Sequence, residues 1–457
     1  MSITAATAAA VPEPELRRRR TITWVVLLGF AGLLFDGYDL VVYGTLVPGF
    51  LRDPSQLGPV TPALAGAIGS YALAGTLVGA ILAGLLVDIV GRRRMLLAGY
   101  LWCPVTMGIT AFTSSTGTFG LMRFVAGIGI GVVIAVTGAV IAEFAPPGKK
   151  NTYSAIAYAG VGTGGVLAAV LAILLLRQIG WQGMLLIGAV PLVVLLPLAW
   201  AKLPESPVWL LSRGRVDDAR AMAERTGSPL AEGAPRSPAS SRQQAGFASL
   251  FRREHLWAVV LFAAVCLLVQ VNVAVLQVWL PELMTRAGFS TQGSLSFLIA
   301  LNGGAVVGAL LVSRIADRIG AKLVVAGQLL LGAGALWLVT FPFPIAVLLV
   351  LVAFVGLGAG GVVNLLYGFM ANYFHTHVRG AGLAWGTSWG RLGNIVGPLA
   401  LGVLVGTVLA LNAIFYTLAA IALIAMILTL LVPRTPPLEL ESVPVQPTVV
   451  AADPARP

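Results

Sequence analysis

The chain alternates between long apolar segments and short polar segments along most of its length. Apolar segments of about 20 residues with few charges are long enough to cross a hydrocarbon core of about 30 Å as helices. Twelve such segments predict helices at residues 22–49, 62–87, 95–113, 116–145, 150–176, 181–201, 255–284, 290–313, 321–341, 343–372, 378–408 and 410–432. They lack the two-residue alternation of a membrane β-strand, and only helices or closed barrels satisfy the backbone in lipid. The pattern therefore predicts an all-α membrane protein with twelve transmembrane helices.

The longest internal polar stretch divides these helices into two sets of six. We assign residues 1–20 to a basic cytoplasmic tail, 21–201 to an N-terminal bundle, 202–253 to a cytoplasmic central loop, 254–433 to a C-terminal bundle and 434–457 to a disordered tail rich in proline. Within the central loop, residues 207–225 predict one short amphipathic helix, and residues 228–246 have the composition of a flexible linker.

Composition and charge support a membrane location. Hydrophobic residues make up 58% of the chain and charged residues only 10%, whereas soluble domains have about 25% charged residues. The net charge of +11 is not a nucleic-acid footprint, because its distribution follows the membrane. If both termini are cytoplasmic, only Arg52, Arg177 and Arg286 of the 29 basic residues lie in outside loops. This bias is the positive-inside pattern of a multi-pass protein of the cell (inner) membrane.

Two loops at corresponding positions of the two halves are similar to each other. GLLVDIVGRRR (Gly84 to Arg94) follows the second predicted helix, and SRIADRIGAK (Ser313 to Lys322) follows the eighth. Such repeats are typical of transporters in which two bundles rock around a central site. The first loop resembles the G-x-x-x-D-R-x-G-R-R signature of the major facilitator superfamily, with Ile89 where that family usually has Arg or Lys.

Further segments extend the resemblance over most of the chain. They are FDGYD in helix 1, RFVAGIGIG in helix 4, LPESPVWL after helix 6, WLPELM in helix 7 and RGAGLAWGTSWGRLGNIVGP in helix 11. Together they resemble the aromatic acid:proton symporter family. The resemblance implies the major facilitator fold, with two pseudo-symmetric six-helix bundles. It also implies import of a hydroxybenzoate, protocatechuate, benzoate or gentisate type of anion, coupled to protons, by alternating access.

Asp36 and Asp39 are the first candidates for proton coupling. They lie deep in the first predicted helix, three residues apart on one face, and Tyr43 continues that face as a substrate-binding candidate. An ionised carboxylate at this depth costs at least a few kcal/mol unless it is paired or hydrated. The alternative is a helix-packing ion pair with an arginine. Arg123 joins the proton-coupling candidates, because the resemblance links the arginine of its motif to proton transfer; a packing role near the outer interface is the alternative.

Arg391 is the main candidate for binding the substrate carboxylate, because a guanidinium stays charged and can hold a carboxylate with two hydrogen bonds. Thr387, Ser388 and Asn394 share its face, and Trp385 and Trp389 lie on adjoining faces as an aromatic wall. The alternative is that Arg391 neutralises Asp36 or Asp39. Polar residues of the second half that could line the same cavity, or instead join helices by hydrogen bonds, are Gln277, Asn302, Asn364 and Tyr367.

The signature loops supply the gating candidates. These are Asp88, Arg92 and Arg93 in the first loop, Asp317 and Arg318 in the second, and Glu143 and Arg379 near the cytoplasmic ends of helices 4 and 11. We expect these charged side chains to form ion pairs across the two halves, and we expect those pairs to break when the transporter opens inward. Charge that only sets the topology is the alternative.

Other functions fit the sequence less well. No P-loop lysine follows a glycine-rich turn, so transport would draw on a proton gradient and need no cofactor. His375 and His377 lack nearby carboxylates or cysteines, so we expect no metal site, and no cluster suggests an enzyme. We expect a monomer. LPESPVWL also resembles a sugar-porter segment, so a sugar, other metabolite or drug transporter of the same superfamily remains the alternative, and a non-transporting sensor would share the fold.

Overall fold

A computed structural model describes residues 13–146, 149–228, 249–375, 378–406 and 410–433 of the chain. Within these ranges all regular secondary structure is helical, and nine of the helices are long and apolar enough to cross a membrane. The predicted tails before residue 13 and after residue 433, and the linker at 229–248, lie outside the described residues.

The first half runs from α1 to α7, and two short helices follow it. Their bounds are α1 Glu13–Arg52, α2 Pro54–Leu57, α3 Pro62–Val90, α4 Arg92–Thr110, α5 Thr116–Phe144, α6 Lys150–Ile187, η1 Val190–Leu192, α7 Leu195–Lys202, α8 Pro207–Ser212 and α9 Val216–Thr226. The second half comprises α11 Arg253–Arg286, α12 Thr291–Ile319, α13 Ala321–Leu338, α14 Ile345–Tyr373, α15 Arg379–Val405 and α16 Leu411–Leu431. Eleven of the twelve predicted helices are thus continuous helices in the structure.

Three details of the prediction were wrong. The predicted helix 181–201 is the end of α6, η1 and α7 in succession, because the backbone ladder is interrupted around Pro191. Gly180, with φ 67°, kinks α6 just before this segment, between the two predicted helices 150–176 and 181–201. The predicted amphipathic helix 207–225 is split into α8 and α9 at Gly214, which has φ 73°. Helix α1 begins at Glu13 rather than near residue 22, so the end of the predicted basic tail is helical.

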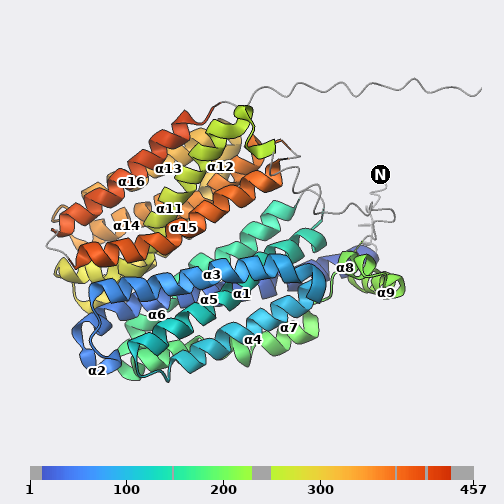
Figure 1. The fold of residues 1–457 in the computed structure, drawn as a ribbon, viewed down its shortest axis with the longest axis horizontal. Coiled ribbons are helices and arrows are strands. Elements are labelled where there is room, and N and C mark those ends of the chain that lie inside the picture. The colour runs from blue at the N-terminus through green and yellow to red at the C-terminus, as the bar shows by residue number, and fades with distance from the viewer. Residues whose placement is uncertain (1–12, 147–148, 229–248, 376–377, 407–409, 434–457) are drawn as a thin grey trace, which may run out of the picture.

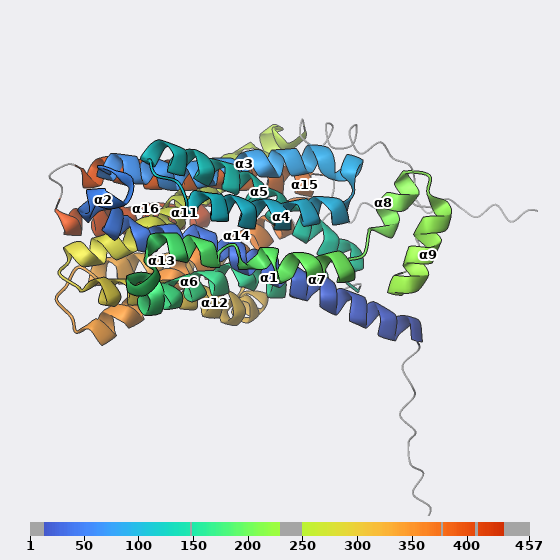
Figure 2. The same ribbon diagram turned by 90° about the horizontal axis from the view of Figure 1, so that it is seen from below.

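The two halves form separate groups of helices that lie side by side (Figure 1). Within the first half, α1 packs on α6 and α3 on α5; within the second, α11 packs on α15 and α12 on α14. Contacts between the halves run mainly through α3 with α15, α6 with α12 and α1 with α11. Both views place α2 at one end of the molecule and α8 and α9 at the other (Figures 1 and 2), and we call these the α2 end and the α9 end.

The halves touch most closely between the middle of the molecule and the α2 end. The Ser70 hydroxyl of α3 donates to the Ile395 carbonyl of α15 at 2.7 Å. A Cβ on Gly402 would lie 2.7 Å from the Pro62 carbonyl oxygen and 3.0 Å from the Gly66 Cα, so α3 and α15 can cross this closely only without side chains there. At the α2 end itself, Arg52 of α1 forms a 3.0 Å ion pair with Glu282 of α11.

Towards the α9 end, α3 is exposed. Ile81, Leu85 and Ile89 succeed one another at four-residue spacing, and Leu85 is 65% exposed. The described halves are therefore closed against each other at the α2 end, while α3 has exposed apolar side chains nearer the α9 end.

Candidate functional site

Asp39 of α1 and Arg123 of α5 form a buried ion pair, with each residue only 2% exposed. The Arg123 Nη1 donates to the Asp39 carboxylate, and its Nη2 donates to the Asp39 backbone carbonyl at 3.3 Å. The second carboxylate oxygen of Asp39 and the Nε of Arg123 are buried without a hydrogen-bond partner among the described residues. Because neither charge reaches water, removal of either would leave the other uncompensated.

Tyr43 lies over this pair and does not line a cavity. It is 1% exposed, and its ring centroid lies 5.3 Å from the Arg123 guanidinium carbon. Its hydroxyl donates to the Ala65 carbonyl of α3 at 2.6 Å. The prediction of Tyr43 as a substrate-binding residue is therefore not supported in this state, because both its ring and its hydroxyl are already engaged.

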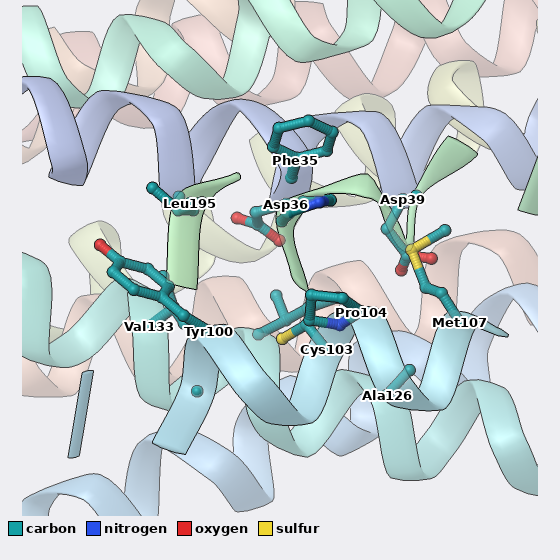
Figure 3. Close-up of a pocket in the computed structure, with 15 residues that line it drawn as sticks. Phe35, Asp36, Asp39, Tyr100, Cys103, Pro104, Met107, Ala126, Val133 and Leu195 are labelled. Atoms are coloured by element: carbon teal, nitrogen blue, oxygen red, sulfur yellow. The ribbon is translucent and has the colours of Figure 1, made fainter. Parts of the chain in front are cut away.

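Asp36 lies one helical turn before Asp39, and both line a cavity inside the first half (Figure 3). The shared face is the one that their spacing predicts. The cavity walls come from α1, α4 and α5 and from the broken stretch that contains η1 and the start of α7. The helix break around Pro191 therefore lies in the wall of the cavity beside Asp36.

The environment of Asp36 is mostly apolar, as Phe35, Tyr100, Cys103 and Pro104 surround it (Figure 3). The Tyr100 hydroxyl is not available to Asp36, since it donates to the Leu28 carbonyl at 3.0 Å. Asp36 is half-buried and has no ion-pair partner within 4.0 Å in the described part of the chain, although it interacts electrostatically with Asp39 and Arg391.

Arg391 lies in the middle of α15, where the two halves meet. Its Nη1 donates to the Thr76 carbonyl of α3 at 3.0 Å. It interacts electrostatically with Tyr367 of α14, Tyr158 of α6 and Asp36. No carboxylate of the described residues forms an ion pair with it. The alternative in which Arg391 neutralises Asp39 is wrong for this state, because Asp39 pairs with Arg123 instead.

Sequence reasoning missed Tyr158. Its hydroxyl donates to the Ile134 carbonyl at 2.9 Å, and its phenol belongs to the surroundings of Arg391. The available signal was a phenol in a stretch of α6 made mostly of small and apolar residues.

The polar neighbours of Arg391 along α15 differ in availability. The hydroxyls of Thr387 and Ser388 donate to carbonyls of their own helix, at 2.8 Å and 2.7 Å. Asn394 is half-buried, and its side-chain oxygen has no partner among the described residues. On α14, Asn364 is exposed and Tyr367 half-buried.

The predicted aromatic wall does not form around Arg391. Trp385 donates to the Val259 carbonyl of α11 at 3.3 Å and packs against Phe251 with ring centroids 5.1 Å apart. Trp389 stacks on Trp385 at 5.7 Å. Two residues correspond to about 200° around a helix, so Trp389 lies on the side of α15 opposite Arg391.

Gln277 and Asn302 bind each other across α11 and α12. The Gln277 amide donates to the Asn302 side-chain oxygen at 2.9 Å, and the Asn302 amide donates back at 3.2 Å. Asn302 is 2% exposed. The structure thus shows the helix-joining alternative for this pair.

The gating candidates of the first signature loop have partners in their own half. Arg92 pairs with Asp88 at 3.1 Å and with Glu143 at 2.8 Å. The Arg93 guanidinium donates to the Trp200 carbonyl at 2.6 Å, and its backbone N–H donates to Glu205 at 3.1 Å.

A cation from outside the loop lies where the signature arginine is missing. Arg213, after α8, donates to the Asp88 and Ile89 carbonyls at 3.1 Å and 2.8 Å, and the Trp209 indole also donates to the Asp88 carbonyl at 2.8 Å. A cation at the C-terminal carbonyls of α3 is favourable. Of the second-half candidates, Arg318 and Arg379 are exposed, and the Asp317 side chain lies outside the described residues. Glu143, a gating candidate like Arg379, pairs with Arg92 of its own half in this state.

Known proteins are similar to this chain in both sequence and structure. A family model described as Major Facilitator Superfamily matches residues 28–398 and 296–454. The benzoate transport protein of Acinetobacter baylyi is 33% identical over 83% of this chain and 82% of its own length. The gentisate transporter of Corynebacterium glutamicum is 31% identical over 88% of this chain and 85% of its own length. The inward open structure of the xylose transporter XylE from E. coli matches with a TM-score of 0.71 at 19% identity, over 92% of this chain and 98% of that one.

The chain therefore belongs to the Major Facilitator Superfamily and, within it, to the aromatic acid transporters. It is a multi-pass membrane transporter and not an enzyme. The resemblance drawn from the signature loop and the helix 1 and helix 11 segments is confirmed.

Proposed function

We propose that the protein is a proton-coupled symporter that imports a small aromatic carboxylate across the cell membrane by alternating access. Both termini and the α9 end would face the cytoplasm. The described state, closed at the α2 end, is then the inward-facing one. The pseudo-symmetric halves 21–201 and 254–433 would move as the two bundles.

The proposed binding of the substrate depends on Arg391. A guanidinium deep in a membrane protein needs a counter-charge or a hydrated cavity, and among the described residues it has only a backbone carbonyl within hydrogen-bonding distance. A substrate carboxylate would supply the missing charge with two parallel hydrogen bonds. Tyr367 belongs to the same surroundings and could bind ring hydroxyl groups, and Tyr158, whose hydroxyl donates to the Ile134 carbonyl, could accept a hydrogen bond from one. The names of the benzoate and gentisate relatives support an aromatic acid.

The proposed proton coupling depends on Asp39 and Arg123. A buried pair stays neutral as a unit, so it can lose that neutrality only when Asp39 gains a proton or Arg123 gains another anion. Asp36, in the adjacent cavity and within electrostatic range, is the candidate relay between Asp39 and the surroundings of Arg391. Symport of at least one proton offsets the anion's charge against an inside-negative potential, which is worth about 2.3 kcal/mol per charge per 100 mV.

The signature-loop charges would control the cytoplasmic gate. In an outward-facing state, Asp88 would exchange Arg92 for a cation of the second half, such as Arg318 or Arg379. In this state Glu143 and Arg213 hold the loop within the first half.

The test is uptake into proteoliposomes that contain the full chain. Labelled benzoate, gentisate and 4-hydroxybenzoate are offered under an imposed inward proton gradient, with nicotinate and xylose as unlabelled competitors. We expect accumulation of at least one aromatic acid that a protonophore abolishes and that xylose does not inhibit. Inhibition of aromatic-acid uptake by xylose, or uptake that does not depend on the gradient, would contradict the proposal.

A further inference from the structure

Tyr43 lies between the buried ion pair and the surface where the two halves meet. Its ring covers the Arg123 guanidinium, with 5.3 Å between ring centroid and guanidinium carbon. A cation held over an aromatic face in a dry site is strongly attracted to it. Because the Arg123 Nε has no hydrogen-bond partner among the described residues, this face is a principal contact of the guanidinium besides Asp39.

The other edge of the same ring packs on α3 at a point where α11 of the second half also packs. A Cβ placed on Gly69 of α3 would lie 3.2 Å from Tyr43 Cε1 and 3.3 Å from Val278 Cγ1 of α11, so the ring and Val278 both press on this glycine. The next residue, Gly44, packs directly on backbone of α11, since a Cβ there would overlap the Gln277 carbonyl. The backbones of α1, α3 and α11 are packed so closely here that they leave no space for a displaced Tyr43 ring.

The Tyr43 hydroxyl ties the ring to α3 as well, through its 2.6 Å hydrogen bond to the Ala65 carbonyl. Ala65 neighbours Gly66, at which α3 crosses α15 of the second half. One side chain thus contacts the ion pair and lies directly beside both crossings, next to Gly44 where α1 crosses α11 and bonded to the residue before Gly66 where α3 crosses α15.

We propose that Tyr43 is the positioning residue that transmits a change at the Asp39–Arg123 pair to the contact between the halves at the α2 end. The inference rests on the proposed proton-coupled function. When Asp39 is neutralised, Arg123 loses its counter-charge and shifts relative to the ring. Because the ring is hydrogen-bonded to the Ala65 carbonyl and packed on Gly69, a movement of the ring moves α3 and loosens the two crossings. The other titratable groups that act electrostatically with Asp39 are Asp36, Tyr38 and Cys103.

Tyr38 is a matched control on the same helix. It is also fully buried, and its hydroxyl also donates to a backbone carbonyl, that of Met184 at 2.7 Å. That carbonyl belongs to α6, which packs on α1 and α12 rather than at the crossings of α1 with α11 and α3 with α15. Loss of a buried tyrosine as such should therefore act alike at the two positions.

The experiment compares gradient-driven accumulation with exchange of labelled benzoate at equal proton concentration on both sides. We expect Tyr43→Leu to lower accumulation about 10-fold while exchange changes by less than about 2-fold, as for the loss of a coupling free energy between sites. Tyr43→Phe, which keeps the ring, should restore most of the accumulation. Equal losses of accumulation and exchange, or the same split in Tyr38→Leu, would overturn the inference.

A second readout needs no substrate and so separates this inference from the proposed function. Leu401, 5% exposed on α15 beside Gly402, is changed to Cys after Cys103→Ser and Cys266→Ser. The labelling of Leu401→Cys by maleimide is divided by that of the exposed reference Gln292→Cys at the same pH, because thiol ionisation alone makes any labelling depend on pH. We expect this ratio to depend on pH in the otherwise unchanged protein and to lose that dependence with Tyr43→Leu but not with Tyr38→Leu. A ratio that is independent of pH from the start, or unaffected by Tyr43→Leu, would refute the role of Tyr43 even if benzoate uptake is normal.

Discussion

The ion pair between Arg52 and Glu282 is expected to set how long the α2 end stays closed. Glu282 has a side chain only 4% exposed and accepts from Arg52 of the first half at 3.0 Å and from Arg286 of its own helix at 2.8 Å. Arg286 also donates to the Val405 carbonyl at 3.3 Å within the second half. Only the Arg52 contact must break when the halves separate there.

The size of the effect follows from exposure. Removing one partner of a buried charge pair costs about 2–5 kcal/mol. Arg52 is 46% exposed and Glu282 would keep Arg286, so we expect Arg52→Gln to destabilise the closed α2 end by about 1–2 kcal/mol. That shifts the ratio of the two states by roughly 5- to 30-fold.

Spin labels measure this ratio directly. Ser114, between α4 and α5, and Gln292, at the start of α12, are exposed at the α2 end and lie in different halves. After replacement of Cys103 and Cys266 by serine, cysteines at these two positions carry the labels, and pulsed dipolar spectroscopy gives the distance distribution. Arg52→Gln should add a longer-distance population.

Arg286→Gln is the matched control, because its contacts with Glu282 and Val405 stay within the second half in both states. We expect it to leave the distribution nearly unchanged. Identical distributions for Arg52→Gln and the parent protein, or an equal shift in Arg286→Gln, would refute the reasoning.

Three further outcomes are expected. Asp39→Asn should abolish gradient-driven accumulation and lower the thermal unfolding temperature, because it leaves Arg123 buried without a counter-charge. The double variant Asp39→Asn with Arg123→Gln should recover the unfolding temperature but not accumulation. Recovery of both would contradict the proton-carrying role of Asp39. Arg391→Lys keeps the charge but loses the planar fork, so KM for benzoate should rise about 10-fold with a smaller change in kcat; an unchanged KM in concentration-dependent uptake would remove Arg391 from the substrate site. Glu143→Gln should destabilise the detergent-solubilised protein by about 1–2 kcal/mol, since its side chain is only 17% exposed, whereas Asp88→Asn, at a side chain 74% exposed, should have little effect in the same melting assay.

Several site residues were identifiable from sequence because intramembrane charge is costly wherever it lies. Asp36, Asp39, Arg123 and Arg391 stand out in apolar helices without any knowledge of their neighbours. Spacing also predicted correctly that the two aspartates share a face. It could have excluded Trp389, because a separation of two residues turns a side chain to the opposite side of a helix.

Partner choice could not be predicted in the same way. Two arginines lie deep in helices, and nothing in a linear chain says which of them meets Asp39. The crossing of α1 with α5 decides it in favour of Arg123, and Arg391 is left at the boundary of the halves. The roles of Tyr43, Tyr158, Gln277 and Arg213 depend in the same way on which helix lies opposite.

The sequence by itself determined the class of this protein, because the length of apolar segments, the one-sided placement of Lys and Arg and the repeated signature loop are properties of local sequence and of the bilayer. The tertiary structure alone decided the pairing of the buried charges, the cavity between Asp36 and the broken sixth helix, and the closure of the α2 end. Those features depend on distances between helices far apart in the chain, which side-chain packing fixes and one-dimensional periodicity does not encode.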